Sequence, residues 1–334
     1  MSRDEGRHRS VNAVIRWGVA GPGEIASGFA DAMRQVSDGE IVAVASRAME
    51  RAERFGDTFG IPTRYADYAA LAADLNVDAV YVATPQSRHA ADTVMYVDAG
   101  KHVLCEKPFA LNARQARVMA DAARARGVFL MEAMWSRFLP AYRALAEVLA
   151  AGRIGEPLQV EADFGIRFPM PHRLYERDLG GGALLDLGIY PVQLCSLVLG
   201  TPDHVVAEGV VGATGVDEQV AAVLRAPGGK LGLVSASIRV GTSGTARISG
   251  TEGWIDLPAF MHCPNSITVT TFGSREELDG SYDGNGLRFQ VEEVHRCLAA
   301  GLTESPVMTL DESIALATTL DAIGAAIGAG YPDE

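Results

Sequence analysis

The sequence predicts an α/β protein in two parts: an N-terminal doubly wound parallel sheet and a C-terminal α/β region with a large, mostly antiparallel open sheet. Two observations predict this architecture. In the first part, short β-branched runs alternate with helical stretches, as right-handed βαβ crossovers require. In the second part, segments with apolar alternation are separated by Gly, Pro, Asp and Asn, which is typical of antiparallel strands. The 334 residues, 48% of them hydrophobic, are enough for two cores.

The N-terminal part alternates strands and helices. We expect strands at 13–20, 41–45 and 79–83, in the run that leads to Lys107, and within the strand and crossover 129–138. We expect helices from the turn at 21–26 through Gln35, and at 48–59, 71–76, 89–99 and 112–126. Because each helix connects two neighbouring strands, the sheet should be parallel, and its ligand should lie outside the carboxyl ends of the strands.

A glycine-rich turn follows the first expected strand and reads Gly21-Pro22-Gly23-Glu24-Ile25-Ala26. Gly21 allows a tight turn, Gly23 lets the backbone approach a pyrophosphate, and the small Ala26 permits close packing of helix on strand. The free N–H groups at the start of the next helix would bind phosphate. In this position the pattern predicts a dinucleotide-binding Rossmann domain over residues 13–134, with residues 21–25 at the cofactor.

The end of the second expected strand discriminates between the two nicotinamide cofactors. NAD-preferring sites usually have Asp or Glu here, to hold the ribose hydroxyls. This chain has Ser46 and Arg47 instead, with Arg51 one helical turn further on. A hydroxyl and two guanidinium groups favour a 2′-phosphate, so NADP is preferred over NAD. The alternative is that both arginines are solvated surface residues.

Further strand ends should converge on the same crevice. Thr84 and Pro85 close the third expected strand, while Glu106 and Lys107 end the next one before a proline that stops it. A lysine at the end of an apolar strand is costly unless something anionic or reactive uses it, although a lysine that points into water is the simpler alternative. His89 could contact the cofactor, cap a helix or lie at the surface.

The C-terminal part should begin at residue 135 and bind the substrate. We expect a helix at 142–151, strands at 158–166, 205–211, 219–225, 230–238, 245–249 and 266–272, and a final helix at 311–328. We interpret the final helix as structural, and its packing back onto the Rossmann domain is left open. The open face of the antiparallel sheet needs a cover, which a second copy of the chain would provide.

A glycine-rich segment between the first two of these strands leads into a second group of polar residues. A helix should start near Ala183, so Asp186 and Tyr190, four residues apart, should share one helical face. A phenol is a poor base, but a neighbouring ammonium stabilises the phenolate, and Lys107 could supply that charge across the crevice. The alternative makes Asp186 a helix-surface carboxylate and Tyr190 a half-buried core aromatic.

Composition limits the possible partners. The net charge of −13 disfavours nucleic acid and anionic membranes. Four distant cysteines without C-x-x-C spacing disfavour disulfides and structural zinc, so we expect a cytoplasmic protein that needs no metal. The charged residues 1–12 lack an apolar core, and we interpret them as a disordered leader.

Long stretches of this chain resemble the glucose–fructose oxidoreductase/inositol dehydrogenase family, and most of all its branch of dimeric dihydrodiol dehydrogenases and NADP-dependent D-xylose dehydrogenases. The resemblance spans the chain after the leader and is carried by WGVAGPGEIAS, VAVASRAMERAERF, HVLCEKPFALN, FLMEAMWSRFLPA, GGALLDLGIYPVQ and ESPVMTLDES. Much of the wider family has histidine where Tyr190 stands, and the tyrosine points away from inositol-type substrates towards the dihydrodiol and sugar branch.

The resemblance implies a set of site residues and an assembly. Lys107 and Tyr190 would transfer the proton, and a cis bond would join Lys107 to Pro108. Dimers would form through the open sheet, and two dimers could pair into a dimer of dimers. The pocket for the substrate would include Trp135, Phe164, Asp186 and Leu187. Trp135 and Arg137 are also assigned to the cofactor site, and Arg167 to the substrate pocket. The segment 164–175 offers further pocket or lid candidates: Arg167, Phe168, His172, Arg173 and Tyr175.

The expected function is an NADP-dependent oxidoreductase that transfers hydride between nicotinamide and a secondary alcohol or ketone of a sugar, polyol or cyclic dihydrodiol. In the oxidation direction Tyr190 would take the alcohol proton, Lys107 would lower the pKa of Tyr190, and Asp186 would orient a substrate hydroxyl or Lys107. Two alternatives remain: a keto-sugar reductase of a biosynthetic pathway, and a non-catalytic NADP-binding sensor or regulatory protein.

Overall fold

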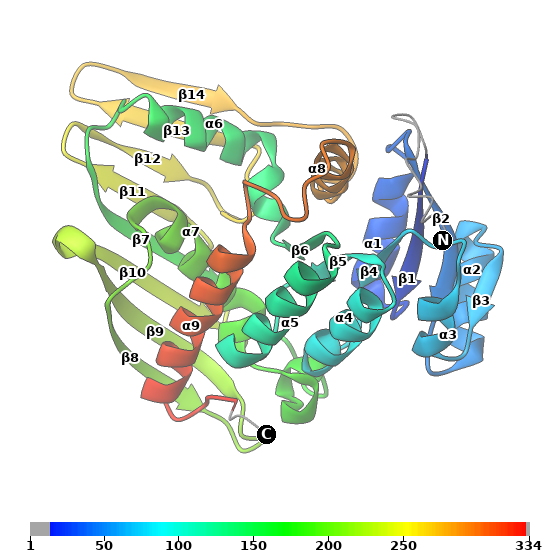
Figure 1. Ribbon diagram of the computed structural model, residues 1–334. Helices are drawn as coiled ribbons and strands as arrows, with labels where there is room; N and C mark the ends of the chain where they lie inside the picture. The colour runs from blue at the N-terminus through cyan, green and yellow to red at the C-terminus, as the bar shows by residue number, and fades with distance from the viewer. Residues whose placement is uncertain (1–13, 332–334) are drawn as a thin grey trace.

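The described residues form two β-sheets, each with helices of its own (Figure 1). This computed structural model describes residues 14–331, so the expected leader at 1–12 lies outside the described residues. The sheet from the first part of the chain has six strands, and the sheet from the second part has eight. The predicted fold class is confirmed: a parallel sheet of Rossmann type is followed by a large, mostly antiparallel sheet.

The first sheet is parallel throughout, in the order β3-β2-β1-β4-β5-β6. Its strands are β1 (Ile15–Ala20), β2 (Gly39–Ala45), β3 (Thr63–Tyr65), β4 (Ala79–Val82), β5 (His102–Glu106) and β6 (Leu130–Ala133). One face packs on α1 (Glu24–Met33) and α2 (Met49–Phe59). The other face packs on α3 (Tyr68–Ala73), α4 (His89–Asp98) and α5 (Ala113–Arg126).

The strand order positions the site. The chain order reverses between β1 and β4, which lie side by side at the centre of the sheet. Helices cover both faces there, so all four residues of β4 are buried, as central parallel strands require. The carboxyl ends of β1, β4 and β5 lead to Gly21, Thr84 and Lys107, and a doubly wound sheet binds its ligand at such a reversal.

The second sheet has the order β14-β13-β12-β11-β7-β10-β9-β8, and only its central pair β7 and β10 is parallel. Its strands are β7 (Pro157–Gly165), β8 (His204–Val211), β9 (Asp217–Ala226), β10 (Lys230–Ser237), β11 (Ala246–Gly250), β12 (Gly253–Leu257), β13 (Ser266–Thr271) and β14 (Arg275–Asp279). Figure 1 shows α6 (Pro140–Ala150), α7 (Ile189–Leu199) and α9 (Leu310–Ala326) along one face. No described element covers the opposite face.

Four elements were absent from the sequence prediction: β3, β12, β14 and the helix α8 (Arg288–Ala299). Strand β3 has three residues, too few for a periodic pattern. Strand β14 reads REELD, a polar sequence without apolar alternation, and it lies at the edge of the sheet with four of its five residues exposed. These strands form because their neighbours supply backbone partners, and that support is not visible in the local sequence.

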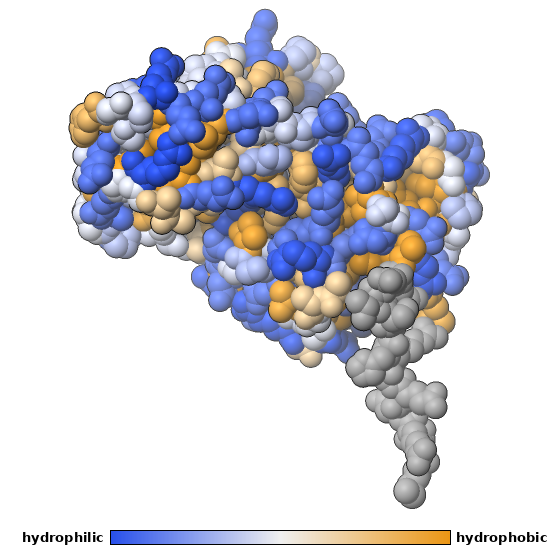
Figure 2. All heavy atoms as spheres, turned by 90° about the horizontal axis from the view of Figure 1, so that it is seen from above, coloured by the Kyte–Doolittle hydropathy of each residue, from blue (hydrophilic) through white to orange (hydrophobic). Residues whose placement is uncertain are grey.

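The most apolar helical stretch, Arg177–Leu199, belongs to the core. It has the length and hydropathy of a membrane-spanning helix, but 83% of its apolar window is buried inside the protein. Helix α9 contacts both α7 and α5, and so joins the two sheets. Figure 2 shows a face on which hydrophilic side chains predominate and hydrophobic ones gather in small groups.

Candidate active site

A cleft of about 970 Å³ lies at the carboxyl ends of the parallel strands and reaches the second sheet's helices. Most sequence-predicted site residues line it: Gly21, Pro22, Gly23, Glu24, Ile25, Ser46, Arg47, Arg51, Thr84, Pro85, His89, Glu106, Lys107, Trp135, Asp186 and Tyr190. Two lid candidates, His172 and Arg173, line it as well. The volume is in the range of small-molecule and cofactor sites.

The turn after β1 has the backbone that a phosphate-binding turn needs. Gly21 has a φ of 87°, and a Cβ there would lie 2.7 Å from the carbonyl oxygen of Ala83. A Cβ on Gly23 would meet nothing within 4 Å, so at this position the backbone is open to a ligand. Helix α1 starts at Glu24 with no side chain capping its first N–H groups. These groups and the helix dipole suit the pyrophosphate of a dinucleotide.

Basic side chains line the far end of the cleft. Ser46 follows β2 and is buried, and its hydroxyl accepts a hydrogen bond from the backbone N–H of Ala48 at 3.3 Å. Arg47 and Arg51 are exposed on either side of the start of α2. Together they place two guanidinium groups and a hydroxyl near the position where a bound dinucleotide carries its adenosine ribose.

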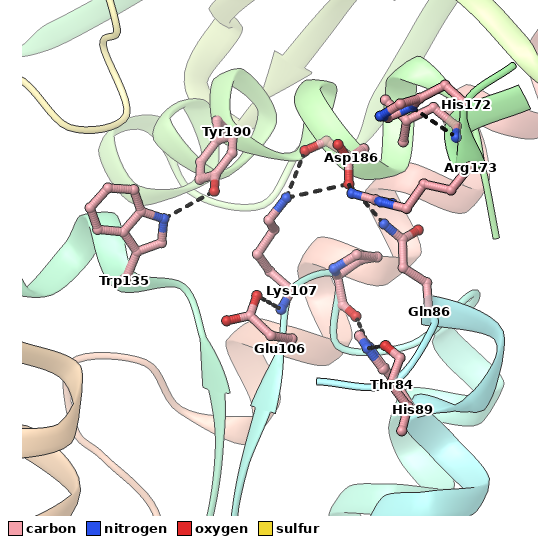
Figure 3. Close-up of polar contacts among 12 residues, drawn as sticks. Thr84, Gln86, His89, Glu106, Lys107, Trp135, His172, Arg173, Asp186 and Tyr190 are labelled. Atoms are coloured by element: carbon pink, nitrogen blue, oxygen red, sulfur yellow. Dashed lines mark hydrogen bonds and ion pairs between the residues drawn. The ribbon is translucent and has the colours of Figure 1, made fainter. Parts of the chain in front are cut away.

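Lys107 lies at the floor of the cleft between the two sheets (Figure 3). Its Nζ donates to the backbone oxygen of Asp186 at 2.9 Å and lies 3.6 Å from the carboxylate oxygen Oδ1 of the same residue. The ammonium also stands 5.0 Å from the centre of the Tyr190 ring. Burial alone would lower the pKa of Lys107, but the charges of Asp186, Tyr190 and Glu106 outweigh it, and the pKa is raised. The Lys107–Pro108 bond is cis, as the resemblance implied.

Asp186 connects three elements through one oxygen atom. Arg173 donates to its Oδ1 at 2.9 Å, and Gln86, which follows β4, donates to the same atom at 3.0 Å. Burial acts to raise the pKa of Asp186, but Lys107 and Arg173 together lower it below its usual value. Asp186 is therefore a carboxylate that holds the lysine, the lid segment and the end of β4 together.

Tyr190 lies on α7, just after the turn that carries Asp186, and faces Lys107. Its hydroxyl accepts a hydrogen bond from Trp135 Nε1 at 3.0 Å (Figure 3). Residues Leu184–Gly188 form a π-helical turn before α7, which the four-residue spacing did not predict. Lys107 lowers the pKa of Tyr190, as expected, but the net pKa lies above the usual value of a phenol. Burial raises the pKa of Tyr190, and the charge of Lys107 offsets only part of that effect. A phenol whose pKa lies above its usual value is protonated at neutral pH.

Glu106 and His89 are fixed by neighbours of the first sheet. Glu106 accepts hydrogen bonds from the hydroxyl of Tyr81 and from the backbone N–H of Lys107, and burial raises its pKa. His89 is buried rather than at the surface, with its ring nitrogens 2.8 Å from the carbonyl oxygen of Pro108 and 3.0 Å from that of Thr84. Burial lowers the pKa of His89, while the carbonyl oxygens of Pro108 and Thr84 oppose that shift, and the ring lies between two strand ends at the wall of the cleft.

Four residues assigned to the site lie outside the walls of the cleft. The guanidinium of Arg137 is buried, and it donates to Glu312 at 2.7 Å and to Gln193 at 3.1 Å. Leu187 is a core residue of the π-helical turn. Phe164 packs behind Tyr190 with the ring centres 5.9 Å apart, and Arg167 is exposed on the loop after β7. The remaining lid candidates, Phe168 and Tyr175, also lie outside the walls.

The sequence analysis missed Gln86, Tyr68 and His262. Gln86 directly follows Thr84-Pro85 at a strand end, and this position was a usable signal. Tyr68, the first residue of α3, lines the cleft without any motif around it. His262 packs on the Tyr190 ring at 4.5 Å between ring centres, and burial followed by the charge of Lys107 lowers its pKa to about 3. Nothing in the sequence links this distant histidine to the site.

Comparison with known proteins decides the family. Residues 15–134 match the oxidoreductase family with an NAD-binding Rossmann fold, and residues 142–256 match the GFO/IDH/MocA C-terminal domain. The chain belongs to the GFO/IDH/MocA family. The trans-1,2-dihydrobenzene-1,2-diol dehydrogenase of Mus musculus is 40% identical over 96% of this chain and 99% of its own length. The recognition made from the sequence is therefore confirmed.

Solved structures share the fold of this chain. The 3-ketoreductase KijD10 from Actinomadura kijaniata, in complex with NADP and TDP-benzene, is 29% identical with a TM-score of 0.83, covering 94% of this chain and 98% of that chain. A levoglucosan dehydrogenase in complex with NADH and levoglucosan shares the fold at 21% identity, with a TM-score of 0.86 and coverage of 94% and 97%. This GFO/IDH/MocA protein is an NAD(P)-dependent dehydrogenase or reductase that acts on CH–OH groups.

Proposed function

We propose that the protein is an NADP-dependent oxidoreductase for a secondary alcohol of a cyclic dihydrodiol or a sugar, and that it uses Lys107, Asp186 and Tyr190. One observation carries the proposal. A lysine ammonium at the floor of the cleft touches both a carboxylate and a phenol, beside a glycine turn shaped for a dinucleotide. The likeness to dihydrodiol dehydrogenases supports the substrate class.

Each residue of the three has a separate task. When the dinucleotide is bound, its nicotinamide supplies the hydride chemistry. Tyr190 moves the proton at the substrate oxygen, because its hydroxyl is the titratable group that the indole of Trp135 holds in the cleft. Lys107 stabilises negative charge as it develops on that oxygen. Asp186 keeps the ammonium in place and bridges it to Arg173, so we assign it to positioning.

The cofactor preference follows from the basic end of the cleft. Among residues 14–331 no carboxylate stands at the end of β2, where NAD-binding sites usually carry one, and Ser46, Arg47 and Arg51 line the cleft there. Guanidinium groups form charge-assisted hydrogen bonds with phosphate. The residues therefore fit the 2′-phosphate of NADP.

The reverse reaction, reduction of a keto-sugar, is the second candidate. The likeness to a 3-ketoreductase supports it, and so does the raised pKa of Tyr190, because a protonated phenol is ready to donate to a carbonyl oxygen. Both directions use the same residues, so the assay must test oxidation and reduction separately.

We propose further that the protein forms a homodimer through the uncovered face of the large sheet. Val206, Val223 and Leu233 form a row across β8, β9 and β10, each paired with the next across the strands, and all three are exposed. A groove of about 970 Å³ crosses the same face. An exposed apolar row across three neighbouring strands marks an interaction surface.

Initial-rate measurements test the proposed function. Oxidation is assayed with aldoses, inositols and trans-1,2-dihydrobenzene-1,2-diol in the presence of NADP or NAD. Reduction is assayed with dicarbonyls and keto-sugars in the presence of NADPH or NADH. We expect turnover of a diol or aldose with NADP, and loss of that turnover in Lys107→Met. Binding of NADP without turnover of any of these compounds would contradict the proposal and favour a regulatory protein.

A further inference from the structure

The segment that carries Asp186 and Tyr190 is held from behind by a second carboxylate. Asp217, the first residue of β9, is 2% exposed, and its Oδ2 accepts a hydrogen bond from the backbone N–H of Leu184 at 2.6 Å. Leu184 starts the π-helical turn, and the first N–H groups of a helix have no partner within it. A carboxylate at this end also faces the positive end of the helix dipole.

The backbone is shaped around this carboxylate. A Cβ on Gly182 would lie 2.2 Å from Asp217 Oδ1, and the φ of Gly182 is 119°, so only glycine fits between them. Burial raises the pKa of Asp217 to about 7, even though the N–H groups of Leu184 and Ala183 oppose the shift. A buried carboxyl group is costly in a core unless it is hydrogen-bonded, and here it bonds to the backbone that leads into Asp186.

Tyr331, at the C-terminal end of the described residues, holds Gly181, the residue before Gly182. The Tyr331 hydroxyl donates to the carbonyl oxygen of Gly181 at 2.6 Å. Arg177 fixes the tyrosine in turn, since its guanidinium lies 4.7 Å from the ring centre and donates to the carbonyl oxygen of Gly330 at 2.8 Å. Asn112, which caps α5 in the first sheet's layer, donates to the backbone oxygen of Tyr331 at 3.4 Å.

We infer that Asp217 and Tyr331 are positioning residues for the reaction: they fix the backbone 181–184 and thereby set where Asp186 and Tyr190 stand relative to Lys107. This inference rests on the proposed function. Neither side chain lines the cleft, so neither touches the substrate. Their effect is exerted through the two glycines and the π-helical turn, and a displacement of about 1 Å at a reacting group costs roughly 10²-fold in rate.

The test uses Asp217→Ala and Tyr331→Phe, which remove the carboxyl group that accepts from Leu184 and the hydroxyl group that donates to Gly181. Tyr65→Phe is the matched control, because it removes a phenol hydrogen bond to Asp74 (3.1 Å) in the first sheet's layer. In the NADP complex of the full chain, hydrogen exchange is measured peptide by peptide. We expect amides of 181–190 to exchange about tenfold faster in both variants and not in the control, as local opening predicts.

Kinetics then separate positioning from mere structure. With NADP and trans-1,2-dihydrobenzene-1,2-diol, we expect kcat to fall about tenfold or more in both variants while the KM for NADP stays constant. The isotope effect on kcat, with the diol deuterated at the reacting carbon, should rise because hydride transfer becomes limiting. A smaller folded fraction alone would leave that isotope effect unchanged.

The outcomes are distinct. Unchanged exchange of 181–190 in both variants overturns the inference, and so does faster exchange with unchanged kcat and isotope effect. If the wild type turns over neither this diol nor D-xylose in either direction, the proposed function fails. Exchange of 181–190 then still decides whether the two side chains anchor the segment.

Discussion

At the scale of single residues, the site depends on one lysine shared by two partners. Lys107 contacts the oxygens of Asp186 and the ring of Tyr190, so the three side chains form one unit. Groups that act as a unit are not additive in their effects. Substitutions of Lys107 and Tyr190 should show this directly.

We expect Tyr190→Phe to lower kcat roughly 10²–10⁴-fold, the usual contribution of a positioned proton donor or acceptor. Lys107→Met should be at least as damaging, and the double variant little worse than the poorer single one. Initial rates and cofactor titration measure both effects, and NADP affinity should stay nearly constant in Tyr190→Phe. Near-full activity of Tyr190→Phe would mean that the tyrosine only packs.

The charge state of Tyr190 is testable without a substrate. Burial raises the pKa of its phenol above the usual value near 10, and the positive charge of Lys107 works against this shift. The difference in phenolate absorbance between the wild type and Tyr190→Phe should therefore stay flat through neutral pH and rise only above pH 10. Lys107→Met should shift the rise to still higher pH, because the opposing charge is gone. A midpoint near neutral pH would restore the phenolate base that the sequence suggested.

The arginines after β2 should set the cofactor preference. Loss of a charged phosphate contact costs roughly 1.5–3 kcal/mol, so Arg47→Ala or Arg51→Ala should weaken NADP binding by at least about tenfold and leave NAD binding unchanged. Arg54→Ala is the control, because it lies on α2 outside the cleft. Calorimetric titration of both cofactors measures the difference. Equal losses for NAD and NADP would assign the arginines to general electrostatics.

At the scale of secondary-structure elements, the two glycines of the phosphate turn have different roles: Gly21 allows the backbone turn, and Gly23 leaves space for the ligand. Gly21 has a positive φ and no room for a Cβ, whereas Gly23 has a φ of −102° and open space. Gly21→Ala should therefore strain the turn and lower the free energy of unfolding by about 1–3 kcal/mol. Gly23→Ala should unfold like the wild type but bind NADP more weakly. Thermal unfolding and cofactor titration measure the pair, and equal stability of both variants would contradict this division.

Elements with a strong local pattern could be predicted from the sequence. Strands β1, β2, β4 and β5, and the helices between them, follow from β-branched runs, glycine turns and helical periodicity. The site residues at strand ends followed too, because topology alone brings Gly21, Thr84 and Lys107 together. Strand β14 and the π-helical turn did not follow, since the first depends on its neighbour β13 and the second on long-range packing.

Tertiary environment also added an effect that the sequence did not show: burial outweighs the expected effect of Lys107 on the pKa of Tyr190. The sequence shows that Lys107 can approach Tyr190, but it does not show how deeply the phenol is buried. Desolvation and the ammonium act on the phenol pKa in opposite directions, and only the packing of Trp135, Phe164 and His262 around the ring decides which is larger.

At the scale of the whole molecule, the uncovered sheet face predicts the assembly. Val206, Val223 and Leu233 are neighbours across the adjacent strands β8, β9 and β10 and are 56%, 41% and 40% exposed. In a dimer built on this face, Leu233→Glu would place a charge in the buried centre of the contact, which costs several kcal/mol without a partner. In a single chain the same side chain faces water, so the fold should persist.

We therefore expect the wild type to be a dimer at micromolar concentration, and Leu233→Glu to be a monomer with an unchanged circular dichroism spectrum. Light scattering coupled to size exclusion measures both. Leu75→Glu is the matched control: Leu75 is 83% exposed, after α3 and far from the large sheet, so its charge should leave the dimer intact. A monomeric wild type would contradict the assembly. A dimer that survives Leu233→Glu would place the contact on another face, because a sheet-to-sheet interface has no room for an unpaired carboxylate at its centre.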